Sequence, residues 1–199
     1  MIILVTGGSG SGKSEFAENC CMKLPAVEKR YIATMQAYDE ESRARIRKHQ
    51  NARSGKGFST VEQGTHLEDV SLPKGCTALL ECMSNLVANE MFAPEGRSEG
   101  CKEVILQGIR HLAAEAKHLV IVSNNIFEDG MEYDSGTKAY MRILGEINQE
   151  VAVLADQVYE VVCGIGILEY MENATIRLSR HFITIRCLFL FLFLLIIFL

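Results

Sequence analysis

Short apolar runs alternate with longer amphipathic stretches along most of the chain. The first run, Met1-Ile2-Ile3-Leu4-Val5-Thr6, is apolar up to its last residue and ends at Gly7-Gly8. A strand that is buried on both faces of a parallel sheet has this character. Similar runs follow at intervals, and the predicted strands are residues 2–6, 31–34, 59–62, 78–81, 119–123 and 158–162.

Helical periodicity occupies the intervals between these runs. In the segment that ends at Lys117, apolar residues at Val104, Ile105, Ile109 and Leu112 lie on one face of a 3.6-residue period. The predicted helices are residues 14–24, 39–50, 83–91, 99–117 and 136–155, and the polar, Gly- and Ser-rich segments 50–57 and 92–100 are predicted loops. Strands separated by such helices form βαβ units, which predicts an α/β fold with a mainly parallel sheet and helices on both faces.

The end of the chain departs from this alternation. Every residue from Cys187 to Leu199 is apolar, and Arg186 comes directly before the run. The run is shorter than the roughly 20 residues that a helix needs to cross a bilayer. Three interpretations stay open: a membrane anchor, a segment buried in an oligomer, or a sequence artefact beyond the end of the domain. We predict one domain over residues 1–172 and a non-catalytic apolar tail over 173–199.

Composition narrows the class of protein. The chain has 199 residues, of which 48% are hydrophobic and 23% charged, so it is long and apolar enough for one packed α/β domain. The net charge of −5 argues against a nucleic-acid partner. The 7 Cys are scattered without a CxxC pair, which disfavours a zinc site and a disulfide framework. With a strand predicted at residue 2, we expect a cytoplasmic protein, with membrane contact left open through residues 187–199.

A phosphate-binding motif follows the first strand. Residues Gly7-Gly8-Ser9-Gly10-Ser11-Gly12-Lys13-Ser14 match G-x-x-x-x-G-K-[ST], between a predicted strand and a predicted helix. Glycines let the backbone curve around phosphates, and the helix that follows presents its positive end. We expect Lys13 to reach the β- and γ-phosphates and the Ser14 hydroxyl to bind Mg²⁺. The fold is therefore predicted to be of the P-loop NTPase type.

A carboxylate is expected near the same magnesium ion. The apolar run Ala78-Leu79-Leu80 ends in Glu81, at the carboxyl edge of a strand where ligands of parallel sheets bind. We predict that Glu81 orders the metal together with Ser14. The alternative is a strand-end glutamate in solvent.

Beyond the phosphate loop, several further segments occur in a characteristic order. They are Tyr31-Ile32-Ala33-Thr34, Arg45-Ile46 with His49 and Arg53, Glu62, Leu79-Leu80-Glu81-Cys82, Asn148-Gln149, Ala155-Asp156 and Gly164-Ile165-Gly166. Over roughly residues 1–168 the chain closely resembles the bifunctional adenosylcobinamide kinase/adenosylcobinamide-phosphate guanylyltransferase family of cobalamin biosynthesis.

The resemblance implies two transfer reactions in one nucleotide pocket. ATP or GTP phosphorylates adenosylcobinamide, and GMP from GTP then passes to adenosylcobinamide phosphate through a histidine–GMP intermediate. Carried over, His49 is the guanylylated residue, with Lys13 as the second catalytic residue. The nucleotide-contacting positions, besides Gly7 to Ser14, are Ala33, Thr34, Met35, Gln50, Asn51, Ala52, Arg53, Glu62 and Glu81.

The chemistry of His49 is compatible with this role. A neutral imidazole is a competent nucleophile, and two successive displacements are ordinary covalent catalysis. On the residues alone, His49 is no more than a histidine on an exposed helix. Two other functions stay open, a kinase with a single activity and a membrane-tethered nucleotide-binding protein. The family also implies a homo-oligomer, a trimer.

Overall fold

The computed structural model describes residues 1–37, 40–127 and 130–171. Within these ranges the side chains of Glu41, Arg45, Lys48, His49, Ala52 and Arg53 are not described. The predicted tail, 173–199, lies outside the described residues, so the predicted domain boundary at 172 stays a prediction.

The described chain forms one seven-stranded sheet in the order β3-β2-β4-β5-β1-β6-β7. Its strands are β1 (Ile2–Thr6), β2 (Lys29–Ala33), β3 (Phe58–Glu62), β4 (Thr77–Glu81), β5 (His118–Val122), β6 (Gln157–Val162) and β7 (Ile165–Met171). Neighbouring strands pair in parallel, except that β7 runs antiparallel to β6. The predicted mainly parallel α/β fold is confirmed, with each of the six predicted strands at its expected place.

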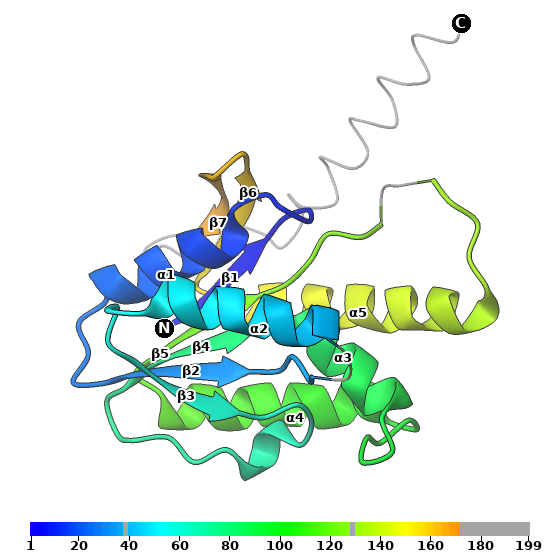
Figure 1. Ribbon diagram of the computed structural model, residues 1–199, viewed down its shortest axis with the longest axis horizontal. Helices are drawn as coiled ribbons and strands as arrows, with labels where there is room; N and C mark the ends of the chain where they lie inside the picture. Colours follow the sequence, from blue (N-terminus) through cyan, green and yellow to red (C-terminus); the bar gives the residue numbers. More distant parts are fainter. Residues whose placement is uncertain (38–39, 128–129, 172–199) are drawn as a thin grey trace, which may run out of the picture.

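The helices lie on both faces of the sheet (Figure 1). They are α1 (Lys13–Lys23), α2 (Glu40–Arg53), α3 (Met83–Phe92), α4 (Cys101–Glu115) and α5 (Ser135–Leu154), and a 3₁₀ turn, η1, covers Leu67–Asp69. Right-handed crossovers place α1 and α2 on one face and α3, α4 and α5 on the other.

Two hydrophobic cores follow from the alternation of side chains along the strands. In β1, Ile3 and Val5 pack toward Ala17 of α1, while Leu4 points to the opposite face and its core. That second core is larger and is closed by α3, α4 and α5, with Leu112 and Leu144 fully buried. Because the central strands are covered on both faces, their sequences read as continuous apolar runs.

Two elements differ from the sequence predictions. Strand β7 was missed, because it is exposed along most of its length and lacks an alternating pattern. It follows β6 through the two-residue turn Cys163-Gly164, in which both residues have positive φ, as a type I′ hairpin requires. Helix α2 extends to Arg53 into the segment 50–57 that was predicted as a loop.

Candidate active site

The phosphate loop connects β1 to α1 and is held from two sides. The Asn125 N–H, after β5, donates to the Gly7 carbonyl at 3.0 Å, and the Gly164 N–H of the β6–β7 turn donates to the Ser11 carbonyl at 2.7 Å. Gly12 comes directly before α1 as its N-cap, with φ +89°, and a Cβ there would lie 3.0 Å from the Gly164 Cα. Only glycine therefore fits where the loop meets the hairpin.

Lys13 lies inside this loop and is only 8% exposed. Its Nζ donates to the Gly8 carbonyl at 3.0 Å, so the ammonium is held among the backbone groups of the motif. Burial lowers the pKa of Lys13, and the neighbouring Cys82 and Glu81 oppose that shift. An anionic phosphate would supply this half-desolvated cation with a partner.

Ser14 and Glu81 meet across the site, as the sequence predicted for a shared metal. The Ser14 hydroxyl donates to Glu81 Oε1, from the first turn of α1 to the carboxyl end of β4. One carboxylate and one hydroxyl suit Mg²⁺, which takes few protein ligands and completes its shell with water and phosphate oxygens. Among the described residues, no three His, Cys, Asp or Glu side chains gather as a protein cage for a metal.

A cavity of about 770 Å³, which we call cavity A, opens at the carboxyl ends of β1, β2, β3 and β4. Nine of its lining residues were predicted as nucleotide-binding: Ser9, Gly10, Gly12, Lys13, Ser14, Ala33, Met35, Glu62 and Glu81. Eight others complete the lining: Glu15, Glu18, Tyr31, Ile46, Lys56, Cys82, Asn85 and Asn124. Cavity A thus brings together residues from the phosphate loop, from α2 and from three further strands.

Other predicted site residues lie elsewhere. Gly8 and Ser11 line a second cavity described below, and Gly7 lines neither. Gln50 and Asn51 are exposed on α2 outside the lining of cavity A. The backbones of His49, Ala52 and Arg53 belong to the same helix, and their side chains lie outside the described part of the structure.

Thr34 is fully buried and contacts protein backbone. Its hydroxyl donates to the Cys82 carbonyl at 2.8 Å and accepts from the Cys82 N–H at 2.7 Å, which ties the end of β2 to the end of β4. Burial raises the pKa of the Cys82 thiol. In this structure Thr34 therefore shapes the site without lining it.

Glu18 and Lys56 form an ion pair on the wall of cavity A that the sequence did not predict. Glu18 is buried on α1, and Lys56 follows α2. A buried carboxylate requires such a partner, and the pair fastens the end of α2 to α1. The signal in the sequence is weak, since neither residue belongs to a motif and 38 positions separate them.

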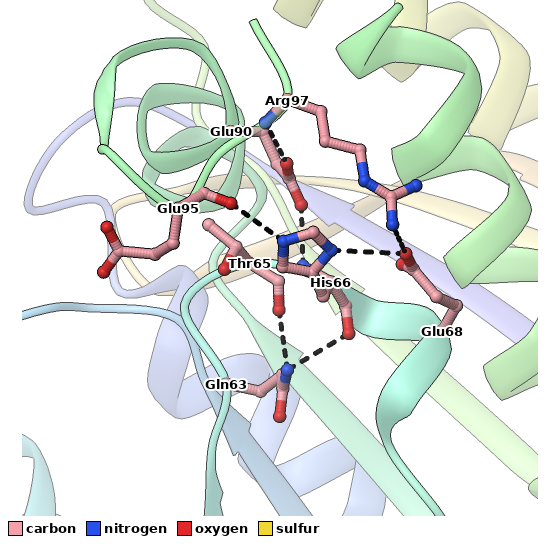
Figure 2. Close-up of polar contacts among 7 residues, drawn as sticks. All are labelled: Gln63, Thr65, His66, Glu68, Glu90, Glu95 and Arg97. Atoms are coloured by element: carbon pink, nitrogen blue, oxygen red, sulfur yellow. Dashed lines mark hydrogen bonds and ion pairs between the residues drawn. The ribbon is translucent and has the colours of Figure 1, made fainter.

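A cluster of polar contacts holds the loop that follows β3, and its members are Gln63, Thr65, His66, Glu68, Glu90, Glu95 and Arg97 (Figure 2). Asn89 of α3 donates to the carbonyls of Thr34 and Gly64, at 2.8 and 2.9 Å. The buried Glu90 carboxylate accepts from the backbone N–H groups of His66 and Arg97, at 2.7 and 3.1 Å. These bonds fix the segments that follow β2 and β3, next to Met35 and Glu62 in the wall of cavity A.

The His66 ring lies within the same cluster. Its Nε2 is 2.8 Å from the Glu95 carbonyl and its Nδ1 is 3.3 Å from Glu68 Oε1 (Figure 2). The bond to Glu95 and the nearby carboxylates raise the pKa of His66. The two ring partners come from η1, which holds Glu68, and from the segment after α3, which holds Glu95.

A second cavity of about 720 Å³, cavity B, opens on the other side of the phosphate loop. It shares Ser9, Gly10 and Asn124 with cavity A. Its remaining lining residues come from the loop and from the ends of β5 and β6: Gly8, Ser11, Asn125, Ile126, Glu160, Val161, Val162 and Cys163.

In residues 1–37, 40–127 and 130–171, no helix has the length and apolar character to span a bilayer.

Known proteins are similar to this chain over most of its length. The chain is 34% identical over 181 residues to the bifunctional adenosylcobalamin biosynthesis protein CobU of Salmonella typhimurium LT2, covering 84% of this chain and 98% of that protein. It is 32% identical to the protein of the same name from Escherichia coli K12, with the same coverage. Among solved structures, an ATPase from the type III secretion system of pathogenic bacteria superposes with a TM-score of 0.48 at 10% identity, over 87% of this chain and 59% of that chain.

Residues 3–168 match the family described as cobinamide kinase / cobinamide phosphate guanyltransferase. This range contains the phosphate loop, α2 and all residues that line cavities A and B. The family predicted from the sequence is confirmed: the chain belongs to the cobinamide kinase / cobinamide phosphate guanyltransferase family.

Proposed function

We propose that this protein is a bifunctional transferase of cobalamin biosynthesis. It phosphorylates adenosylcobinamide with ATP or GTP, and it transfers GMP from GTP to adenosylcobinamide phosphate through His49. Both activities are supported by membership of the family and by two bifunctional relatives that this chain matches over nearly their full length. The observation that carries the proposal is cavity A, whose wall combines a phosphate loop with Ile46 of α2, the helix that contains His49.

In the first reaction, a hydroxyl oxygen of adenosylcobinamide bonds to the γ-phosphorus of the nucleotide. The bond from that phosphorus to the β,γ-bridging oxygen breaks, the nucleoside diphosphate leaves, and the hydroxyl proton passes to solvent. Lys13 is suited to stabilise charge on the transferring group, because its buried ammonium is already fixed in the loop.

In the second reaction, a nitrogen of the His49 imidazole bonds to the α-phosphorus of GTP, and pyrophosphate leaves. A phosphate oxygen of adenosylcobinamide phosphate then attacks the same phosphorus, and the bond to nitrogen breaks. Glu62, on the wall of cavity A, is a suitable partner for guanine, whose ring N–H and amino group can both donate to a carboxylate.

Ser14 and Glu81 would hold Mg²⁺, in keeping with their direct contact and oxygen donors. When bound, the ion would neutralise charge on the phosphate oxygens. A cytoplasmic location, contact with a membrane through residues 187–199 and assembly as a trimer stay predictions.

Intact-mass analysis after incubation with GTP and Mg²⁺ tests the proposal. We expect the full chain to gain one GMP, as an acid-labile and base-stable phosphoramidate. His49→Ala should lose this adduct and keep phosphoryl transfer to adenosylcobinamide. The matched control is His111→Ala on α4, whose ring contacts the Val70 carbonyl away from both cavities. An adduct that persists in His49→Ala would overturn the assignment of the nucleophile.

A further inference from the structure

The phosphate loop has an open cavity on each side, and the two differ in chemistry. Cavity A alone contains Lys13, Ser14 and Glu81. Cavity B alone contains Ile126, Glu160 and Val162. Both include Ser9, Gly10 and Asn124, so a triphosphate on the loop would border both cavities.

Phosphoryl transfer sets one direction for the triphosphate. In loops of this motif, the lysine reaches the β- and γ-phosphates and the backbone N–H groups hold the α- and β-phosphates. Because Lys13, Ser14 and Glu81 all lie on the side of cavity A, the γ-phosphate belongs on that side. The nucleoside, at the other end of the triphosphate, then extends past Ser9–Ser11 toward cavity B.

Guanylyl transfer requires the opposite direction. There the α-phosphate is attacked from α2, and α2 contributes Ile46 to the wall of cavity A. The α-phosphate and its guanosine therefore belong in cavity A, near Glu62. One loop can serve both reactions if its backbone donors bind whichever phosphates are presented to them.

Resting on the proposed function, we propose that cavity B is a second nucleoside site, which holds the purine nucleoside of the phosphoryl donor. The triphosphate lies across the loop in opposite directions in the two reactions. The aliphatic side chains of Ile126 and Val162 would pack against a purine ring, and Asn124 and Glu160 offer polar groups to the base or ribose. The volume of about 720 Å³ is within the range of small-molecule sites.

Paired Val→Trp variants of the full chain test this placement. Val162 is 46% exposed and lines cavity B, while Val153 is 68% exposed on α5 and lines neither cavity. Val162→Trp should raise the KM for ATP in phosphoryl transfer at least about tenfold more than the KM for GTP in self-guanylylation. Val153→Trp should change neither. Equal changes in both reactions, or a rise in the KM for adenosylcobinamide in place of ATP, would overturn the proposal.

Photolabelling locates the nucleoside whether or not the chain is catalytically active. With 8-azido-ATP as probe, we expect labelling within residues 124–126 or 160–163 that ATP competes away and that Val162→Trp weakens. Label on residues 33–35 or 62, or no label that ATP displaces, would contradict a nucleoside site in cavity B. Label in cavity B without transfer activity would count against the proposed function alone.

Discussion

At the scale of single residues, the contact between Ser14 and Glu81 joins parts of the chain that are 67 positions apart. The motif alone requires a hydroxyl at position 14, and the end of an apolar run suggests a carboxylate at 81. The parallel sheet supplies the remaining condition, because the carboxyl ends of β1 and β4 lie at the same edge. The order and direction of the strands therefore bring together the Ser14 hydroxyl and the Glu81 carboxylate, whose oxygen atoms suit magnesium.

Glu81→Gln tests this pairing. The amide preserves size and removes the charge that would attract the metal, so we expect phosphoryl transfer to fall roughly a hundredfold. Part of the loss should be recovered at high Mg²⁺ concentration, which a titration of the rate against the metal measures. Glu15→Gln is the matched control, since Glu15 lines the same cavity and is not the partner of Ser14. Equal behaviour of the two variants would argue against a metal role for Glu81.

Thr34 illustrates a residue whose contribution is structural although it lies in a predicted nucleotide segment. Thr34→Val keeps the shape of the side chain and removes the acceptor for the buried Cys82 N–H. We expect the free energy of unfolding to fall by about 1–3 kcal/mol, measured by denaturant titration. Thr34→Ser retains the hydroxyl and should lose less. If Thr34→Val were as stable as the unsubstituted chain, the two bonds to Cys82 would not tie β2 to β4.

At the scale of elements, the buried strands were predictable and the exposed ones were less so. A central parallel strand such as Leu119–Val122 must be apolar on both faces, which makes it visible in the sequence. Strand β7 is exposed, and its turn and its pairing with β6 define it. The hydrophobic pattern of the sequence indicates neither of these features. The end of α2 was misjudged for a related reason: residues 50–53 contain no large apolar side chain, so no hydrophobic periodicity marks them as helix.

The candidate site divides in the same way. Phosphate-loop residues were predictable because backbone geometry demands glycines at fixed spacing. The pair Glu18–Lys56 and the bonds of Asn89 and Glu90 were not, because each joins elements that are distant along the chain. Such contacts depend on the finished packing, and no local pattern records them.

The contacts of the His66 ring predict that the stability of the folded chain depends on pH. The pKa of His66 is raised in the folded chain, chiefly by the bond to the Glu95 carbonyl, so folding favours the protonated ring. Its contribution is complete below the unfolded pKa of about 6.5 and is lost as pH rises through the folded value. The facing charges are Glu68, Glu90 and Arg97, of which Arg97 pairs with Glu68 at 3.1 Å.

We therefore expect the free energy of unfolding to decrease between about pH 6 and pH 9 by more in the original chain than in His66→Gln. Denaturant titrations at several pH values measure this difference. His111→Gln, another histidine bonded to a backbone carbonyl, should leave the His66 component intact. A pH profile that is unchanged in His66→Gln would exclude the ring as the source.

At the scale of the whole molecule, the described sheet and both cavities are complete before the apolar tail begins. Strand β7 ends at Met171, the last lining residue of either cavity is Cys163, and the family match ends at residue 168. No contact that we describe at the site requires a residue beyond these. That residues 173–199 have no catalytic role stays a prediction.

A chain that ends at Met171 tests this separation. We expect it to keep the thermal midpoint and both transfer activities of the full chain, because every group assigned to binding or chemistry is retained. Binding to lipid vesicles and mass in solution then discriminate between the interpretations of the tail. Loss of vesicle binding on truncation would identify an anchor, and loss of oligomeric mass would identify a segment buried between subunits. A truncated chain that folds and yet loses either transfer activity would show that the tail contributes to the site, since removal of an appendage alone cannot change the chemistry at cavities A and B.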